Sequence, residues 1–556
     1  MSLFKFFVFL TFTAVISASS YAGCPPDGPL LPRPKDLANS AFVQNATQQL
    51  QTSIDQALTG QIRAGWSVEN TSFSIGLMSA DDPSNRPIWE YHYRGSGNAN
   101  GTETIDGDTQ YLIGSISKLV SDLLVLRTGI DLDASITEYL PQLSNSSSIV
   151  HWENVTLASL ADHLSGIPPN YGFSEFCFLT PLLEELGFPP ISPDDLADCG
   201  ITGLNGPCSQ QQLLDGMITA QPITVPYQRP VYSQLSFTLL SYALSAKFNK
   251  TYAELLDEYV VKPLGLDNTG VSPGNTSLAA IPPVENSWGS DYGDNAPGGG
   301  LVSSLNDISR IMKFILDYTA LNTETEVREW LKPHSSTSSP YTLVGRPWEI
   351  FRSTNLTPAH PHTIDIYSKN GGAYGYTAQM AAIDQYGIGI AILTSGPADA
   401  YRILNDAMLS VFLPAVEEEA RLQAQQYTGS FASDDNLQFY SYALPQFGVL
   451  SPEFRIFPAE FTQDGVLEQN GQKVTVIRED WRINLDFLPN TAESSGSELP
   501  GQGAWKEFCS AWQTTDWFYY GGKAVDRIVF LKEREGGNIL GVEVPFLRVT
   551  LINEAQ

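Results

Sequence analysis

The chain has few basic residues and little histidine or cysteine. Its 556 residues include 31 Lys and Arg against 61 Asp and Glu, a formal net charge of −30 at pH 7. A surface this acidic repels phosphate backbones and anionic lipid headgroups, so binding to nucleic acid or to a membrane surface is disfavoured. The 6 His and 5 Cys show no ligand spacing, so we expect neither a metal site nor a cofactor.

Long hydrophobic runs are also missing, except for one near the N-terminus. Residues 6–18 are almost wholly apolar, follow a single charge at Lys5, and precede small residues at Ser20 and Ala22. The run is shorter than the roughly 20 residues that a membrane span needs. The pattern is typical of a secretory signal peptide over residues 1–22, so we expect a secreted, extracellular protein.

Acceptors for N-glycosylation are abundant in the first two thirds of the chain. Eight Asn-x-Ser/Thr sequons precede residue 360, where chance predicts about three. The predicted sites are Asn45, Asn70, Asn100, Asn145, Asn154, Asn249, Asn275 and Asn355. The sequons indicate a glycoprotein from a eukaryotic secretory route.

The five cysteines are expected to pair in an oxidising compartment. Cys177, Cys199 and Cys208 lie within one short segment, which predicts a local disulfide there. Cys24 and Cys509 lie far from that segment and from each other. The odd number leaves one free thiol or one intermolecular bond, and the pairing stays open.

The chain is rich enough in apolar residues, at 42%, to build a sizeable core. Alternation predicts paired strands within 65–112 and strands at 376–384 and 387–394. Helical spacing predicts helices at 115–127, 234–248, 252–262, 306–318 and 398–425. After residue 427 helix patterns nearly vanish and β-prone segments follow. We therefore expect a domain over 23–425, with a Pro-, Gly- and Cys-rich insertion at 165–230, and a β-rich domain over 426–556.

Ser115 and Lys118 open the predicted helix at 115–127, and at this spacing they share one helical face. The unpaired N–H groups and the dipole at a helix N-terminus favour an alkoxide and a nearby oxyanion. A lysine with a lowered pKa can then take the serine proton. The alternative for Ser115 is an ordinary N-cap serine.

A second serine, Ser272, lies in a Gly-x-Ser-x-Gly pattern typical of a nucleophile elbow. In such an elbow the residue after the serine donates its backbone N–H to the oxyanion. Pro273 has no N–H, and we expect neither a strand before the pattern nor a helix after it, so we interpret this segment as a turn.

Two later segments could complete the first candidate. Tyr232-Ser233-Gln234 precedes a predicted helix, and Lys369-Asn370-Gly371-Gly372 precedes a predicted strand. A tyrosine near cations can pass protons, and Lys369 could support it or bind a substrate carboxylate. Taken alone, the tyrosine could simply pack and the second segment could be a hairpin turn.

In this order Ser115-x-x-Lys118, Tyr232-x-Gln234 and Lys369-x-Gly371 resemble the first, second and third motifs, Ser-x-x-Lys, Tyr-x-Asn and Lys/His-x-Gly, of one superfamily. It is the serine β-lactamase and penicillin-binding-protein superfamily, specifically its class C β-lactamase-like hydrolases. The resemblance covers about 65 to 420 and includes the segments LDLDASITEYLP (130–141), LADHLSGIPP (160–169), YAELLDEYVVKPLGL (252–266) and PGGGLVSSLNDISRIMKFIL (297–316). It implies an α+β fold of the β-lactamase/transpeptidase type, with an antiparallel sheet flanked by helices and an all-helical subdomain. The β-rich tail resembles the C-terminal β domain of secreted fungal members.

The resemblance also implies roles for these residues. Ser115 is the acyl-accepting nucleophile and Lys118 is its general base partner. Tyr232 assists proton transfer to the leaving group, and Lys369 supports Tyr232 electrostatically. The backbone N–H groups of Ser115 and Gly372 form the oxyanion hole, beside Gly371 in the third motif.

One position departs from the family pattern, because Gln234 replaces the asparagine of the second motif. The longer side chain puts β-lactam hydrolysis in doubt more than acyl-enzyme chemistry. His163, within a family segment, is interpreted as structural.

Three functions remain open at this stage. The first is a serine hydrolase that cleaves a small-molecule ester or amide through an acyl-enzyme. The second is an acyltransferase of secondary metabolism that passes the same acyl group to an alcohol or amine. The third is a binding or sensing protein without turnover, which only Gln234 favours. The substrate and the oligomeric state are left open.

Overall fold

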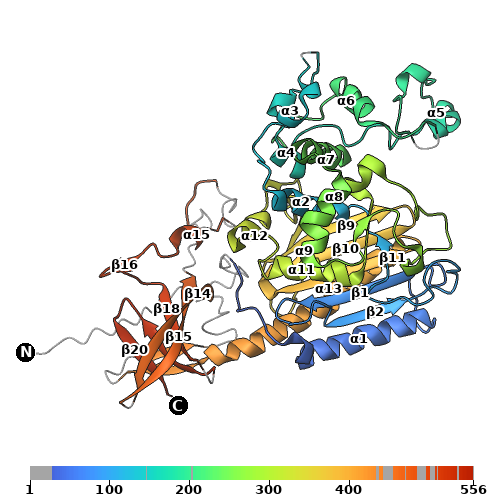
Figure 1. Ribbon diagram of the computed structural model, residues 1–556. Coiled ribbons are helices and arrows are strands. Elements are labelled where there is room, and N and C mark those ends of the chain that lie inside the picture. The colour runs from blue at the N-terminus through green and yellow to red at the C-terminus, as the bar shows by residue number, and fades with distance from the viewer. Residues whose placement is uncertain are drawn as a thin grey trace, which may run out of the picture. The chain divides into compact units, whose positions relative to one another are not determined.

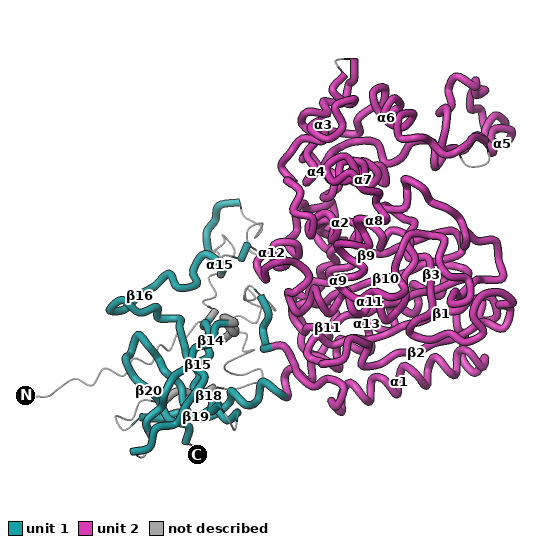
Figure 2. Tube along the Cα trace, in the orientation of Figure 1, with its two compact units in different colours: residues 1–32, 423–556 teal, residues 33–422 magenta. Residues whose placement is uncertain are grey.

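The computed structural model describes residues 28–145, 147–201, 204–433, 438–441, 455–469, 471–484, 496–500, 508–509, 511–534 and 537–554. The chain divides into two compact units, one of residues 33–422 and the other of residues 1–32 and 423–556 (Figure 2). The predicted signal peptide and Cys24 lie outside the described residues.

The larger unit is built on an eight-stranded antiparallel sheet with the strand order β2-β1-β11-β10-β9-β8-β7-β6 (Figure 1). The strands are β1 (Ser72–Ser79), β2 (Trp89–Tyr93), β6 (Ser335–Ser336), β7 (Thr342–Val344), β8 (Glu349–Ser353), β9 (Ile364–Ala373), β10 (Tyr376–Ile383) and β11 (Ile388–Ser395). Every residue of β1 and β11 is buried, because helices cover both faces of the sheet. The predicted strands in this unit are confirmed.

The helices of this unit include the predicted ones. They are α1 (Ala41–Leu58), α2 (Ile116–Thr128), α3 (Ile136–Tyr139), α4 (Leu157–Ala161), α5 (Thr180–Glu185), α6 (Gln210–Ile218), α7 (Gln234–Phe248), α8 (Tyr252–Leu256), α9 (Lys262–Leu264), α10 (Ala296–Gly299), α11 (Leu305–Leu316), α12 (Glu324–Trp330) and α13 (Asp399–Ala424). The predicted helix at 252–262 is divided, since a π-helical turn over Asp257–Val261 separates α8 from α9.

Alternating residues of the strands build two separate cores. In β11, Ile390 and Ile392 pack with α1 and α13, whereas Ala391 and Leu393 pack with α2, α7 and α11. Lys369 lies two residues after Tyr367 in β9, so the two side chains are on the same face of the sheet. Tyr367 packs against the core that contains α2, α7 and α11. The sheet therefore presents the third predicted motif to the face that carries α2.

A short three-stranded sheet holds the turn that leads into α2. Its strands are β3 (Tyr111–Leu112), β4 (Gly270–Val271) and β5 (Leu301–Ser303). At its other end α2 stops at Gly129, whose φ of 65° is left-handed and costs a glycine little.

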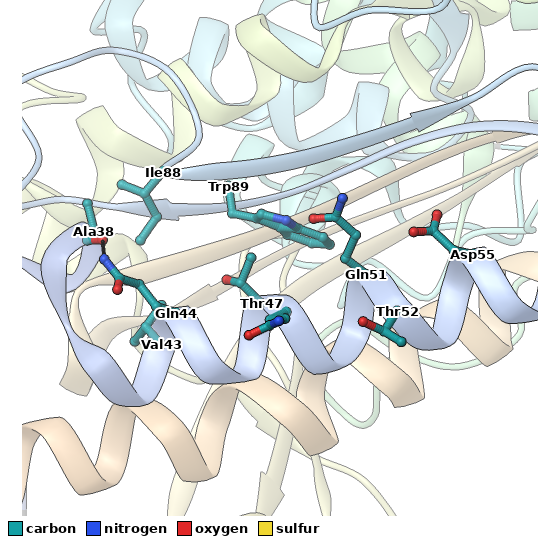
Figure 3. A pocket seen from close by; sticks show the side chains of 10 residues that line it. Ala38, Val43, Gln44, Thr47, Gln51, Thr52, Asp55, Ile88 and Trp89 are labelled. Atoms are coloured by element: carbon teal, nitrogen blue, oxygen red, sulfur yellow. Dashed lines mark hydrogen bonds between the residues drawn. The ribbon is translucent and has the colours of Figure 1, made fainter.

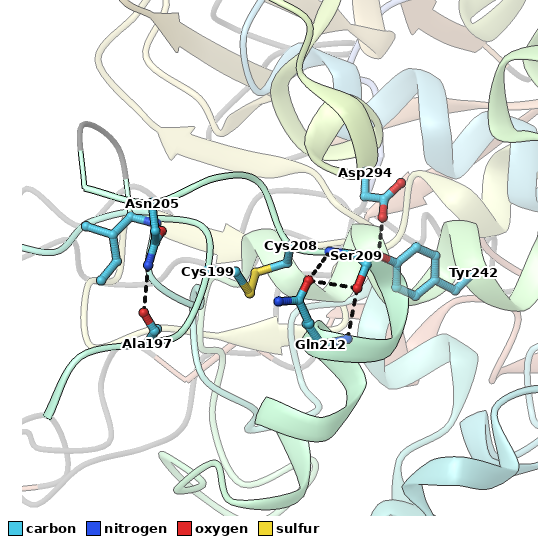
Figure 4. Close-up of a disulfide and its surroundings, with 9 residues drawn as sticks. Ala197, Cys199, Asn205, Cys208, Ser209, Gln212, Tyr242 and Asp294 are labelled. Carbon is cyan, nitrogen blue, oxygen red and sulfur yellow. Dashed lines mark hydrogen bonds between the residues drawn. A yellow bond between two sulfur atoms is a disulfide. The ribbon is translucent and has the colours of Figure 1, made fainter. Parts of the chain in front are cut away.

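The segment between α4 and α7 contains the short helices α5 and α6 and the disulfide Cys199–Cys208 (Figure 4). This bond confirms the local disulfide predicted within 177–208. Cys177 is a free thiol, and Cys509 is disulfide-bonded.

A groove of about 410 Å³ lies between α1 and β2, on the face of the sheet opposite α2, and includes Asp55 and Trp89 (Figure 3). None of its lining residues belongs to the predicted site. Within the described part of the chain, no helix is both long and apolar enough to span a membrane.

The smaller unit is dominated by β structure. Its seven-stranded sheet has the order β13-β12-β20-β19-β18-β15-β14. The elements are β12 (Gly429–Ala432), β13 (Gln438–Ser441), β14 (Arg455–Gln469), β15 (Gln472–Asn484), β18 (Arg527–Glu533), β19 (Ile539–Val544), β20 (Val549–Asn553), a separate pair β16 (Tyr519–Tyr520) and β17 (Lys523–Ala524), and the short helix α15 (Ala511–Thr514). Tyr427, Trp481 and Phe530 form an aromatic cluster with ring centroids 4.7–5.3 Å apart. The predicted smaller β domain is confirmed as a fold class.

Candidate active site

Ser115 occupies the N-cap position of α2, but its side chain does not cap the helix. Its Oγ instead lies 3.2 Å from Lys118 Nζ, one turn along the same face. Gly114, which precedes it, has a φ of 51°, so the chain enters the helix through a conformation that favours glycine. The alternative of an ordinary capping serine is therefore wrong.

Lys118 is completely buried among neutral oxygen atoms. Its side chain is 0% exposed, and Nζ also contacts Gln234 Oε1 at 2.5 Å and the Gly298 carbonyl oxygen. Burial first, and then the positive charge of Lys369, lowers the pKa of Lys118 well below its usual range, although Glu349 opposes this effect. A neutral amine has two N–H donors for the two carbonyl oxygens and a lone pair for the Ser115 hydroxyl.

Gln234 is the first residue of α7, and its side-chain amide is held at both ends. Oε1 accepts from Lys118, and Nε2 donates to the Asn295 carbonyl oxygen at 3.2 Å. A Cβ on Gly298 would lie 2.1–2.7 Å from the amide atoms of Gln234. The missing side chain at Gly298 therefore provides the room that the longer arm of Gln234 needs.

Tyr232 lies at the mouth of the site, with its side chain 44% exposed. Lys118 Nζ and Lys369 Nζ lie 4.8 Å and 5.1 Å from the centroid of its ring. Within the described residues its hydroxyl makes no hydrogen bond, which leaves it available to a bound molecule.

His163 packs against the ring of Tyr232. The two rings are 4.6 Å apart, and Nδ1 of His163 accepts a hydrogen bond from the Ser233 backbone N–H at 3.2 Å. Burial, followed by the charges of Lys118 and Lys369, lowers the pKa of His163 well below its usual range. The imidazole is therefore neutral, and its contacts agree with the structural interpretation.

Lys369 is 1% exposed and is held by a residue that the sequence analysis missed. Its Nζ contacts Glu349 Oε1 and, at 3.0 Å, the Asn370 carbonyl oxygen. Glu349 is the first residue of β8 and is paired in register with Ser368. No local motif marks Glu349, because only the register between β8 and β9 brings it to Lys369.

The backbone of the third motif lies against the start of α2. A Cβ on Gly371 would lie 1.9 Å from the Ile113 carbonyl oxygen and 3.0 Å from the Ser115 backbone nitrogen. A Cβ on Gly114 would lie 2.5 Å from the Gly372 backbone nitrogen. These approaches require glycines and place the backbone of Gly371 and Gly372 beside the turn that carries the Ser115 N–H.

The competing serine, Ser272, is part of the scaffold. It is buried, and its Oγ donates to the Ser290 carbonyl oxygen at 2.7 Å. A two-residue strand, β4, does precede it, and the Ser272–Pro273 peptide is cis. Its hydroxyl therefore bonds to a backbone carbonyl oxygen, whereas the hydroxyl of Ser115 lies beside Lys118.

Comparisons with known proteins agree with this arrangement. Residues 43–411 match the Beta-lactamase family, and residues 435–555 match a family described as "Beta-lactamase-like-like, C-terminal domain". A "Beta-lactamase-like protein" of Arthroderma benhamiae is 46% identical over 98% of both chains. A "Probable hydrolase M10" of a Phoma species is 21% identical over 97% of this chain and 92% of its own.

A further relative matches a smaller part of the chain. The "D-alanyl-D-alanine-carboxypeptidase/endopeptidase AmpH" of Escherichia coli is 23% identical over 54% of this chain and 75% of its own. The match over residues 43–411 covers more than half of the chain and includes Ser115, Lys118, Tyr232 and Lys369. The chain therefore belongs to the Beta-lactamase family and has the β-lactamase/transpeptidase-like fold, followed by a smaller β domain.

Proposed function

We propose that this protein is a secreted serine hydrolase that cleaves a small-molecule ester or amide through an acyl-enzyme on Ser115. The observation that carries the proposal is the pairing of the Ser115 hydroxyl with a buried lysine whose pKa is lowered. A serine hydroxyl is a weak nucleophile unless a base takes its proton, and neutral Lys118 can act as that base.

Acylation begins when Ser115 Oγ attacks the substrate carbonyl carbon and its proton passes to Lys118. The N–H groups of Ser115 and Gly372 stabilise the resulting oxyanion, helped by the position of Ser115 at the start of α2. Collapse of the tetrahedral intermediate breaks the bond to the leaving group, which takes its proton from Tyr232 or Lys118. In deacylation water attacks the acyl carbon while the same groups accept its proton, and Ser115 is restored.

In this mechanism the role of Gln234 is to orient Lys118. Its Oε1 accepts one of the two N–H bonds of the neutral amine, which directs the lone pair toward Ser115. This contact supports turnover over the alternative of a binding protein, which only Gln234 favours. Hydrolysis and acyl transfer share every step up to the acyl-enzyme, and the acceptor alone separates them.

The test is intact mass spectrometry of the deglycosylated protein after treatment with a fluorophosphonate and, separately, with a penicillin. Wild type is compared with Ser115→Ala. We expect one fluorophosphonate adduct that the variant lacks, and turnover of aryl esters that falls by about 10³-fold or more in the variant. An adduct of equal yield in both proteins would contradict the assignment of Ser115. Adding alcohols and measuring transesterification against hydrolysis tests the acyltransferase alternative.

A further inference from the structure

We propose that Glu349 determines which substrates this site accepts. It pairs with Lys369, the cation of the third motif, so that the enzyme acts on acyl groups that carry no carboxylate. The inference rests on the proposed function, because it concerns the substrate of the same Ser115 site. It disfavours one of the two roles that the sequence offers Lys369, the binding of a substrate carboxylate, and leaves the other, the support of Tyr232.

Three donors of the third motif converge on the Glu349 carboxylate. Lys369 Nζ contacts Oε1, while the Asn370 side-chain Nδ2 and backbone N–H donate to Oε2 at 2.6 Å and 3.1 Å. The contact with Lys369 is the charge-assisted contact that an incoming carboxylate would otherwise make with this cation. Asn370, the next residue in β9, faces the other side of the sheet and holds Glu349 from there. A second acceptor of Lys369 Nζ is the Asn370 carbonyl oxygen, so two of its three N–H donors are already used.

The charges around the nucleophile explain why this contact matters. Lys118 and Lys369 are 0% and 1% exposed, whereas the Glu349 side chain is 33% exposed. Lys118 is favoured as the neutral amine, so Lys369 is the cation that an acyl-chain carboxylate would need. With Glu349 in place, that carboxylate would stand beside a like charge, and a juxtaposition of this kind is strongly unfavourable. The net charge of −30 acts in the same direction.

The proposal is tested with two esters of equal chain length, 4-nitrophenyl hexanoate and mono-4-nitrophenyl adipate. They share the leaving group and differ in one terminal group, a methyl or a carboxylate. We expect wild type to prefer the hexanoate by about tenfold or more in kcat/KM, after subtraction of the Ser115→Ala background. Glu349→Gln keeps an oxygen acceptor for Lys369 but removes the negative charge, and should raise the adipate-to-hexanoate ratio by about tenfold.

Two further variants control the measurement. Glu285→Gln removes the same charge from an exposed glutamate that accepts from the Tyr374 hydroxyl, and should leave the ratio unchanged. Glu349→Asp keeps the charge on a shorter arm and should give a ratio between those of wild type and Glu349→Gln. This second variant keeps the test decisive if Glu349→Gln does not fold.

A pH profile separates this electrostatic role from mere support of the fold. The groups around Lys118 are Ser115, Gln234 and the Gly298 carbonyl in direct contact, with Lys369, Tyr232, His163 and Glu349 beyond them. Glu349 raises the pKa of Lys118, so Glu349→Gln should move the acidic limb of kcat/KM for the hexanoate to lower pH. Loss of packing alone would lower the plateau without moving the limb in this direction.

The outcomes distinguish the two proposals. Equal or better use of the adipate by wild type, or an unchanged ratio in both Glu349 variants, overturns the role of Glu349 and leaves Ser115 catalysis intact. Equal release of 4-nitrophenol by wild type and Ser115→Ala overturns the proposed function, and the inference falls with it.

Discussion

The amine nitrogens of the two lysines of the site lie 4.8 Å and 5.1 Å from the centroid of the Tyr232 ring, yet their surroundings are opposite in character. Lys118, on α2, meets only neutral oxygens from Ser115, Gln234 and Gly298. Lys369, on β9, meets the carboxylate of Glu349. Both are almost wholly buried, so the difference comes from the partners and not from the depth of burial.

The comparison shows how one site can hold a base and a cation a short distance apart. Burial among uncharged acceptors favours the neutral amine, and a nearby positive charge adds to the effect. Lys369 is instead paired with the carboxylate of Glu349. Lys369 thereby lowers the pKa of Lys118, and Glu349 limits that influence.

The largest expected effect is on activity, from Lys118→Met. This substitution removes the base while keeping an unbranched side chain, and we expect kcat/KM to fall by about 10²–10⁴-fold. Lys369→Met should cost less, because it removes a supporting charge and not the proton acceptor. It should also move the acidic limb of the pH profile to higher pH, since the pKa of Lys118 rises when the positive neighbour is lost.

One result from this pair of variants would contradict the prediction. The acidic limb of Lys369→Met must move opposite to that of Glu349→Gln, because their charges act on Lys118 with opposite sign. If both variants moved the limb in one direction, the contrast between the two lysines would be wrong.

A smaller loss is expected from Gly298→Ala, which disturbs the surroundings of Lys118 without touching a charge. The new Cβ would lie 2.1 Å from Gln234 Nε2, so the amide of Gln234 must move, which disturbs the contact of its Oε1 with Lys118. We expect kcat to fall by about 10–100-fold with a modest change in KM, because a small misplacement of a catalytic group is costly. Steady-state kinetics on the hexanoate ester measures both parameters.

Gly299→Ala is the matched control for that experiment. It lies in the same short helix, and its Cβ would be 3.7 Å from Gln234 Nε2, an ordinary contact distance. Equal losses in the two alanine variants would mean that α10 as a whole, and not the room for Gln234, determines activity.

The surroundings of the two lysines also show how much of the site can be predicted from the sequence. Ser115 and Lys118 are one helical turn apart, so their encounter follows from local spacing, and α7 and β10 begin where the patterns predicted. Glu349 is 20 residues before Lys369 and reaches it through the register Glu349↔Ser368, which no local pattern encodes. The role of Gly298 cannot be predicted from a local pattern either, because it depends on the packing of α10 beside α7.

The smallest expected effect is on stability. It comes from a second pair of buried groups with contrasting surroundings, the carboxyl groups of Asp122 and Asp162. Asp122 accepts one hydrogen bond, from Trp330 Nε1 at 2.7 Å, whereas Asp162 is paired with Arg346 and His334. Burial raises the pKa of Asp122 well above its usual range. Hydrogen bonds from His334 and Arg346 outweigh burial and lower that of Asp162.

The stabilities of Asp122→Asn and Asp162→Asn should therefore depend on pH in opposite ways. A raised folded-state pKa destabilises wild type increasingly above the unfolded value near pH 4, at about 1.4 kcal/mol for each pKa unit. Asp122→Asn should gain Tm relative to wild type between pH 4 and pH 7. Asp162→Asn should melt below wild type at every pH from 4 to 7, because the ion pair with Arg346 that it removes is fully formed above the unfolded value, and this deficit should shrink only below pH 4. Calorimetric melting at both pH values measures the two differences, and parallel changes would show that Asp122 is ionised in the folded protein.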